Sequence, residues 1–128
     1  MKILGIGVDL IENKRISNLI NNKSFIKRTF GKREVNLAKK FSNKINYFAK
    51  RFAAKEAFAK SLGTGFRNNL NFKDIEILND KIGKPYFSKS KKINQIINKK
   101  FKIKKFDLFL SISDEKDYSI AFTILQKK

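Results

Sequence analysis

The longest stretch with apolar residues at helical spacing runs from Asn46 to Leu62. Alanines and phenylalanines recur along it at intervals of three and four residues, which predicts a largely buried helix of strong helix formers. We expect Asn46 to cap its N-terminus and Gly63 to follow its last turn. Glu56 and Lys60, four residues apart, share one face of this helix. They could be an ordinary surface ion pair, or a metal ligand and a phosphate contact that face a cleft.

Three shorter repeats of apolar residues predict further helices. They cover residues 13–22, residues 32–41, and a segment that Ser88 can cap and that ends near Phe101. Residues 24–29 indicate an irregular or short helical connection. Basic side chains are dense between Lys23 and Arg33, which fits a solvated face or a docking surface.

The first predicted strand, Lys2–Leu10, is a short apolar run rich in β-branched residues. Gly5 and Gly7 within it are typical of a buried strand that another backbone approaches closely. Asp9 follows the apolar part of this run. Taken alone, Asp9 fits a solvated strand end or a helix cap as well as a ligand.

Alternation of apolar and polar residues predicts the remaining strands. Residues 72–78 are expected to pair with residues 81–87, where Pro85 indicates an edge strand or a loop. Residues 108–113 and 118–126 flank a tight turn at residues 114–117. Short connections make both pairs antiparallel. The sequence therefore predicts an α+β fold, one domain over residues 1–128, with helices packed on a small, largely antiparallel sheet.

Charge and composition narrow the function. The chain has 128 residues and a net charge of +19, which favours an acidic partner: nucleic acid, an anionic membrane or an acidic protein. An AT-rich genome would also enrich Lys, Asn, Ile and Phe, so the charge does not choose among these partners. No apolar run reaches the ~18 residues of a membrane helix and no signal-peptide pattern is present, so we expect a cytoplasmic protein with no membrane partner.

The chain contains neither cysteine nor histidine, so a metal ion would be held by oxygen atoms, as magnesium is. Asp9 and Glu56 stand out among the acidic residues because each lies within a largely apolar stretch that predicts a buried element. Two carboxylates could hold one Mg²⁺ if phosphate oxygens and waters complete its coordination. Lys60, one helical turn from Glu56, would then neutralise a phosphate.

Several short motifs occur in a distinctive order. They are Gly5-Ile-Gly-Val-Asp9, Arg15-Ile16, Arg51-Phe-Ala-Ala-Lys-Glu-Ala-Phe-Ala-Lys60, Gly63-Thr-Gly65, Gly83-Lys-Pro85-Tyr86 and Ser111-Ile-Ser113. In this order they resemble the holo-acyl-carrier-protein synthase family, the small trimeric class of 4′-phosphopantetheinyl transferases. The resemblance covers nearly the whole chain. Its most specific part is the aspartate of the first strand together with aromatic-x-x-Lys-Glu-Ala-x-x-Lys.

The resemblance implies a Mg²⁺-dependent enzyme that moves the 4′-phosphopantetheine arm of coenzyme A onto a serine of an acidic acyl carrier protein, in support of fatty acid biosynthesis. Asp9 and Glu56 look like the magnesium ligands, and Lys60 like a catalytic contact to a phosphate. Arg15 matches a position that contacts the carrier protein. The implied assembly is a homotrimer with active sites between subunits.

The resemblance also implies where coenzyme A binds. By motif match, its nucleotide would contact the residues Lys60, Gly63, Gly83, Lys84, Pro85, Ser111 and Ser113. At position 114 the family commonly has histidine, whereas this chain has Asp114 followed by Glu115. Two carboxylates near a phosphate would repel it unless they turn away or pair with Lys116 or with a lysine of a neighbouring subunit.

Two other functions compete with this interpretation. A small basic RNA- or ribosome-binding protein would account for the charge and the phenylalanines. However, the sequence has no RNA-recognition signature and its aromatic residues fall at core spacing, so we expect no nucleic-acid partner. A catalytically silent relative is the second alternative, because Asp114 replaces the expected histidine.

Overall fold

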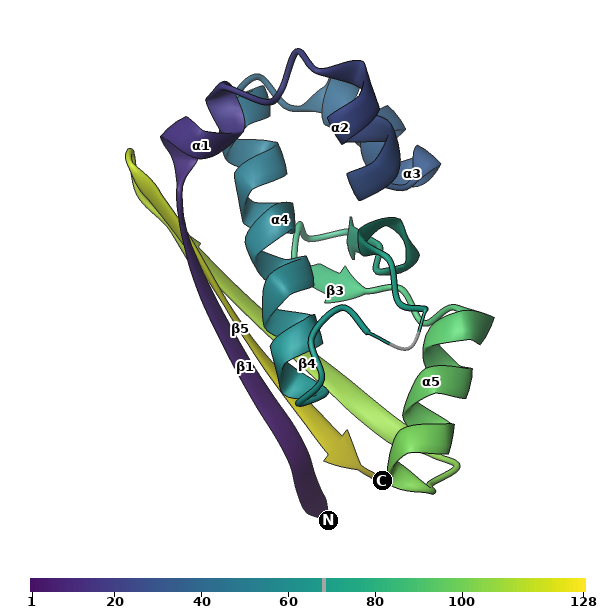
Figure 1. Cartoon of the computed structure of the whole chain (residues 1–128). Helices are drawn as coiled ribbons and strands as arrows, with labels where there is room; N and C mark the ends of the chain where they lie inside the picture. The colour runs from purple at the N-terminus through teal and green to yellow at the C-terminus, as the bar shows by residue number, and fades with distance from the viewer. Residues whose placement is uncertain (68) are drawn as a thin grey trace.

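A three-stranded antiparallel sheet and one long helix form the centre of the molecule. The computed structural model describes residues 1–67 and 69–128. The sheet contains β1 (Lys2–Glu12), β5 (Tyr118–Lys127) and β4 (Phe106–Asp114), in the order β1-β5-β4. Helix α4 (Lys44–Ser61) lies along one face of this sheet (Figure 1). The predicted α+β class with a small antiparallel sheet is confirmed.

The remaining elements surround α4. They are α1 (Asn13–Ser17), α2 (Lys23–Thr29), α3 (Lys32–Leu37), the 3₁₀ helices Ala38–Lys40 and Phe72–Asp74, β2 (Ile77–Asn79), β3 (Pro85–Phe87) and α5 (Lys91–Phe101). Strands β2 and β3 form a separate antiparallel hairpin. Helices α1, α2 and α3 lie toward the N-terminal end of α4, and α5 lies near the chain termini (Figure 1).

Glycine allows α4 to approach β1 closely. A Cβ atom placed on Gly5 would lie 1.8 Å from the carbonyl oxygen of Ser61, and one placed on Gly7 would lie 1.8 Å from that of Ala57. No side chain fits at either position. The predicted close approach of another backbone is therefore confirmed, and that backbone belongs to α4.

Strand β5 alternates between small buried residues and large exposed ones. Ser119, Ala121 and Thr123 are buried, whereas Ile120 and Phe122 on the opposite face are exposed. The small side chains leave room for α4 on the inner face, and the large ones form an apolar outer face. The prediction of a buried strand at residues 2–10 is therefore right for only one face of β1, which also continues to Glu12.

Two predicted helix caps are wrong. Helix α4 begins at Lys44, and the side chain of Asn43 accepts a hydrogen bond from the backbone N–H of Asn46 at 3.0 Å. Helix α5 is capped by Ser90, whose hydroxyl accepts from the N–H of Ile93 at 3.2 Å. Ser88 does not cap this helix: its N–H donates to the carbonyl of Glu76, next to the β2–β3 hairpin, and its hydroxyl accepts from the Arg33 guanidinium at 2.9 Å.

Several predicted elements are shorter than expected or divided. The strand predicted for residues 72–78 is observed only at Ile77–Asn79, because the Asp74 side chain accepts a hydrogen bond from the N–H of Asn71 at 2.8 Å and closes a 3₁₀ turn. The helix predicted for residues 13–22 ends at Ser17 and continues as turns. Residues 32–41 likewise divide into α3 and a 3₁₀ helix.

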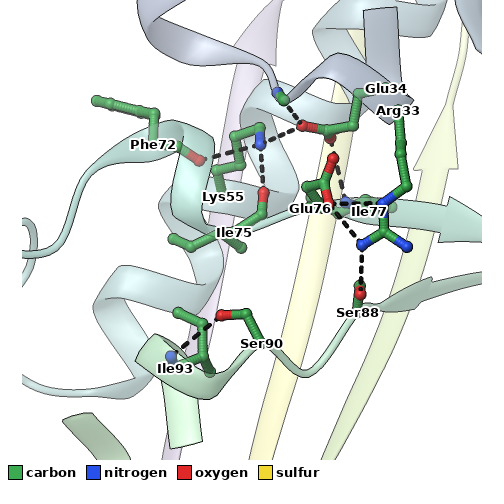
Figure 2. A network of polar contacts seen from close by, with 11 residues as sticks. Arg33, Glu34, Lys55, Phe72, Ile75, Glu76, Ile77, Ser88, Ser90 and Ile93 are labelled. Carbon is green, nitrogen blue, oxygen red and sulfur yellow. Dashed lines mark hydrogen bonds and ion pairs between the residues drawn. The ribbon is translucent and has the colours of Figure 1, made fainter. Parts of the chain in front are cut away.

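A buried ion pair joins α4 to the segments beside it. Lys55 and Glu34 have side chains that are 0% exposed, and the Lys55 Nζ atom lies 2.6 Å from Glu34 Oε1 (Figure 2). Lys55 also donates to the carbonyls of Phe72 and Ile75. Glu34 accepts further hydrogen bonds from the backbone N–H groups of residues 31 and 77. Because each charge has several partners, the pair fixes α3 and the start of β2 against α4.

None of the helices among residues 1–67 and 69–128 combines the length and the apolar character that a membrane crossing requires.

Candidate active site

Asp9 lies within β1, on the face of the sheet that α4 covers. Its backbone pairs with Ala121 of β5, two residues beyond the contact of Gly7 with α4. The Asp9 side chain is 17% exposed. Because β1 continues for three more residues, Asp9 is held by the sheet on both sides and is not a frayed strand end.

Lys60 in the last turn of α4 reaches Asp9. Its Nζ atom lies 3.2 Å from Asp9 Oδ1 and donates to the carbonyl oxygen of Val8 at 3.0 Å. Its partner is therefore the aspartate of β1 and not Glu56, which excludes the surface pair Glu56–Lys60 as the main contact of this lysine.

Glu56 completes the cluster from the preceding turn of α4. Burial raises the pKa of the Glu56 carboxyl, and the negative charge of Asp9 raises this pKa further. The cations Lys60 and Arg15 act in the opposite direction on the same pKa. Four of the predicted site residues, Asp9, Arg15, Glu56 and Lys60, are thus close enough to influence one another electrostatically.

The two carboxylates fit a hard divalent cation. They are half-buried oxygen donors whose mutual repulsion a cation would relieve. Across the described residues no group of three acidic side chains converges that could hold a metal ion alone. Asp9 and Glu56 would therefore supply part of a magnesium shell, with the remaining positions open to phosphate oxygens and water.

The glycines predicted to contact a nucleotide lie at two turns. Gly63 follows α4 with φ of +78°, which confirms its place after the last helical turn, and an added Cβ would meet no atom within 4 Å. Gly83, with φ of +90°, lies in the β2–β3 hairpin next to the exposed Lys84 and to Pro85. Both backbones are open to approach by a ligand.

Side-chain contacts tie the hairpin to α4. The Gly83 carbonyl accepts a hydrogen bond from the Asn79 amide at 2.9 Å, and Asn79 in turn accepts from the guanidinium of Arg51. The Arg51 guanidinium carbon lies 3.7 Å from the centroid of the Tyr47 ring. The hairpin is therefore positioned by the same helix that carries Glu56 and Lys60.

Ser111 and Ser113 lie on the other face of the sheet. Their partners in β5 are Phe122 and Ile120, which belong to the apolar outer face. Asp9 points to the inner face, so one chain does not bring these serines to the carboxylates. A second copy of the chain would be needed to bring them into the same site.

Asp114 is directed toward the first turn of α4. Its Oδ2 atom accepts a hydrogen bond from the side-chain amide of Asn46 at 2.5 Å. The partner of this carboxylate within the chain is therefore a neutral amide on α4, an arrangement that the sequence did not predict. Sequence reasoning missed this role of Asn46 because an asparagine near a helix start is also a good cap.

Asn13 is a second residue that sequence reasoning missed. Its amide donates to the carbonyls of Glu115 and Lys116 at 3.2 and 3.1 Å, and its oxygen accepts from the Ser119 hydroxyl at 2.8 Å. It thereby holds the β4–β5 turn against the start of α1, two residues before Arg15. Nothing in the local sequence signals a contact across more than 100 residues.

Comparison with known proteins identifies the family. The family model of the 4′-phosphopantetheinyl transferase superfamily matches residues 5–123. The chain belongs to this superfamily. Within it, the chain is 62% identical over 128 residues to a holo-[acyl-carrier-protein] synthase of Pelagibacter ubique, with 100% of both chains covered. The resemblance to the holo-[acyl-carrier-protein] synthase family is therefore confirmed.

Solved structures of this transferase family have the same fold. A holo-(acyl-carrier-protein) synthase from Bacillus anthracis, in complex with CoA (3′,5′-ADP), is 34% identical with a TM-score of 0.82 and full coverage of both chains. The synthase from Neisseria meningitidis is 38% identical with a TM-score of 0.84, covering 98% of this chain and 99% of its own.

Proposed function

We propose that this chain transfers the 4′-phosphopantetheine group of coenzyme A to a serine of apo acyl carrier protein, in a Mg²⁺-dependent reaction. The observation that carries the proposal is the convergence of Asp9, Glu56 and Lys60 where β1 passes α4. Membership of the holo-[acyl-carrier-protein] synthase family and the coenzyme A complex of a relative support the same substrate. The reaction would serve fatty acid biosynthesis in the cytoplasm.

The reaction exchanges one phosphorus–oxygen bond for another. The serine oxygen of the carrier forms a bond to the phosphorus that bears pantetheine, and the bond from that phosphorus to the bridging oxygen breaks. Adenosine 3′,5′-bisphosphate leaves with the bridging oxygen, and the hydroxyl proton passes to a base. Because the chain has no histidine, this base is a carboxylate or a water molecule.

Each site residue has a distinct part in this proposal. Asp9 and Glu56 would hold Mg²⁺, and the ion would supply charge neutralisation on the pyrophosphate. Lys60 would leave Asp9 to contact a phosphate, where its ammonium group stabilises the charge that develops on the leaving group. Because α4 and β1 pack closely, the backbone positions of all three residues are set before the substrate arrives, and only the Lys60 side chain has to move.

The nucleotide of coenzyme A would bind between two copies of the chain. One copy would contact the nucleotide through Gly63 and through the loop of Gly83, Lys84 and Pro85. Ser111 and Ser113 lie on the outer sheet face, so they would reach the nucleotide of a neighbouring copy. We therefore propose a homotrimer in which the apolar outer face is buried and the active sites lie between subunits.

Arg15 would contact the acidic carrier protein. It is exposed in α1 and close enough to Glu56 to oppose, in small part, the rise in the pKa of that carboxyl. A cation at this place can hold an acidic surface of the carrier beside the reacting groups, because electrostatic complementarity fixes the orientation of a docked partner.

A direct measurement of the carrier tests the proposed function. Apo acyl carrier protein incubated with the enzyme, coenzyme A and Mg²⁺ should gain the mass of one phosphopantetheine, and chelation of Mg²⁺ should stop the gain. Asp9→Asn, which keeps the shape but removes the charge, should lower the rate at least about 100-fold. Asp107→Asn, at a surface ion pair with Lys128, is the matched control and should retain activity. An unmodified carrier with the unaltered enzyme would contradict the proposed function.

A further inference from the structure

Residues of α2, α3 and α4 line an apolar groove. Helices α2 and α3 lie toward the N-terminal end of α4 (Figure 1). The volume of the groove is about 700 Å³. Ile26, Phe30, Val35 and Phe48 form its apolar wall. None of the residues that line the groove belongs to the cluster of Asp9, Glu56 and Lys60.

The groove reaches the hydrophobic core. Phe30 and Phe48 at its inner wall are only 2% and 6% exposed, and both belong to the main core cluster. Ile26 and Val35, nearer the opening, are partly exposed. Access to these two rings is therefore limited. A single alkyl chain needs less access than an α-helix, which is about 10 Å wide.

Cations surround the opening. Five exposed lysines line it: Lys23, Lys27, Lys32, Lys39 and Lys73. No acidic residue is part of the lining, and within the described chain none of these lysines forms an ion pair. The positive charge at the opening is thus complementary to an anionic group, and the apolar wall below it is complementary to an apolar chain.

We propose that this groove binds a medium-chain fatty acid, with the alkyl chain against Phe30 and Phe48 and the carboxylate among the lysines. The volume lies within the range of about 300–1,000 Å³ usual for small-molecule sites. Mostly apolar walls with a few polar groups at the opening are also usual for such sites. This ligand is neither a substrate nor a product of the proposed transfer, so the two proposals stand or fall separately.

A chain-length series tests the apolar part. Octanoate, decanoate and dodecanoate, kept below their micelle concentrations, are titrated into the unaltered protein and followed by calorimetry. Each buried methylene should tighten binding about fourfold. Dodecyltrimethylammonium, with the same chain length and the opposite charge, should bind at least about tenfold more weakly than dodecanoate. Equal affinity for these two ligands, or no dependence on chain length, would overturn the proposal.

Substitutions show whether the groove is the binding site. Val35→Trp should fill it and weaken dodecanoate binding at least about tenfold, whereas Ile82→Trp, which adds the same side chain at an exposed hairpin position, should leave binding unchanged. Equal affinity of these two variants would place the ligand elsewhere, for example on the apolar outer face, and would refute the assignment.

Charge reversal gives an answer even if Val35→Trp fails to fold. The double substitution Lys27→Glu with Lys39→Glu, both on the surface, should weaken dodecanoate binding about tenfold at low salt. Lys99→Glu with Lys104→Glu, exposed at the other end of the molecule, is the control with the same change in net charge. If the first pair instead raises only the KM for carrier protein while dodecanoate does not bind, the groove contacts a protein and the proposal is wrong.

Discussion

In the absence of a cation, the charged form of Glu56 lowers the stability of the folded protein. Its carboxyl is half-buried and shares its surroundings with Asp9, and both effects raise its pKa. A carboxyl whose pKa is higher in the folded state stabilises the fold below its unfolded pKa, and this stability is lost as the pH rises through the folded pKa. At neutral pH the negative charge of Glu56 therefore opposes folding, although the same charge is needed to hold a metal ion.

Glu56→Gln should separate stability from activity. In metal-free protein at pH 7 we expect the melting temperature to rise by a few degrees, and the gain should vanish below about pH 4, where the carboxyl is protonated in both states. Phosphopantetheine transfer should fall at least about 100-fold in the same variant. Scanning calorimetry at several pH values checks the first result, and Asp107→Asn, at a surface ion pair with Lys128, should change both properties little. A lower melting temperature at pH 7 would contradict the pKa argument.

At the scale of elements, the ion pair Lys55–Glu34 fixes what surrounds the active-site helix. Lys55 precedes Glu56, so the two side chains leave α4 in different directions: one toward α3 and β2, the other toward β1. All partners of Lys55 lie outside α4 (Figure 2). The pair therefore opposes rotation of α4 about its axis, which would move Glu56 away from Asp9.

Lys55→Met should lower the free energy of unfolding by about 3–5 kcal/mol, because it leaves the Glu34 carboxylate buried without its counter-ion. Urea denaturation measures this loss. Lys92→Met, which removes the partly exposed pair Lys92–Asp74, should cost less than about 1 kcal/mol. Adding Glu34→Gln to Lys55→Met should recover part of the stability, since the buried charge is then gone. If Lys55→Met and Lys92→Met lowered the free energy of unfolding equally, the burial of the Lys55–Glu34 pair would have no effect on stability.

Gly7→Ala tests the contact between β1 and α4. A Cβ at Gly7 would lie 1.8 Å from the Ala57 carbonyl oxygen, so strand and helix must separate, at a cost of about 3 kcal/mol or more. Gly65→Ala is the control: its φ is +66° but an added Cβ meets no atom within 4 Å, so only the backbone strain of about 1 kcal/mol applies. Gly7→Ala should therefore lower the free energy of unfolding more than Gly65→Ala does, and urea denaturation of both variants measures the difference.

The sequence predicted best the long helices and strands in which apolar residues recur at one regular spacing. α4, β4 and β5 have many repeats of one period, whereas residues 72–78 alternate for only a few positions before a single hydrogen bond to Asp74 favours a turn. In the candidate site, Asp9, Glu56 and Lys60 were predicted by their motif, and their proximity is confirmed. The amide of Asn46 on Asp114 was not predictable, because it depends on strand register and helix start together.

At the scale of the whole molecule, the outer face of the sheet is the main surface without an internal partner. β1 and β5 place Val8 beside Phe122 and Leu10 beside Ile120, and all four are exposed. Contiguous apolar surface of this kind is typical of an interface between chains. Ser111 and Ser113 lie next to it, which links the proposed assembly to the proposed active site.

Val8→Lys should therefore disrupt both assembly and activity. A lysine at the centre of the outer face should convert the proposed trimer to monomer at micromolar concentration, and transfer should fall at least about tenfold although Asp9, Glu56 and Lys60 are unchanged. Light scattering coupled to size-exclusion chromatography measures the first effect. Ile82→Lys, in the exposed hairpin turn, should leave the trimer and its activity intact. A fully active monomer would contradict the proposed intersubunit site.

The order of strands in the sheet also constrains how the protein folds during synthesis. β5 is the central strand, yet it is the last strand along the chain, and β1 pairs with no other strand of the sheet. On the ribosome, β1 and α4 emerge long before residues 118–127. Their apolar faces therefore remain unpaired with β5 while translation continues. Pairing across more than 100 residues is also slow to form. Partly made chains therefore expose apolar surface until β5 is complete, which is the condition that favours aggregation during folding.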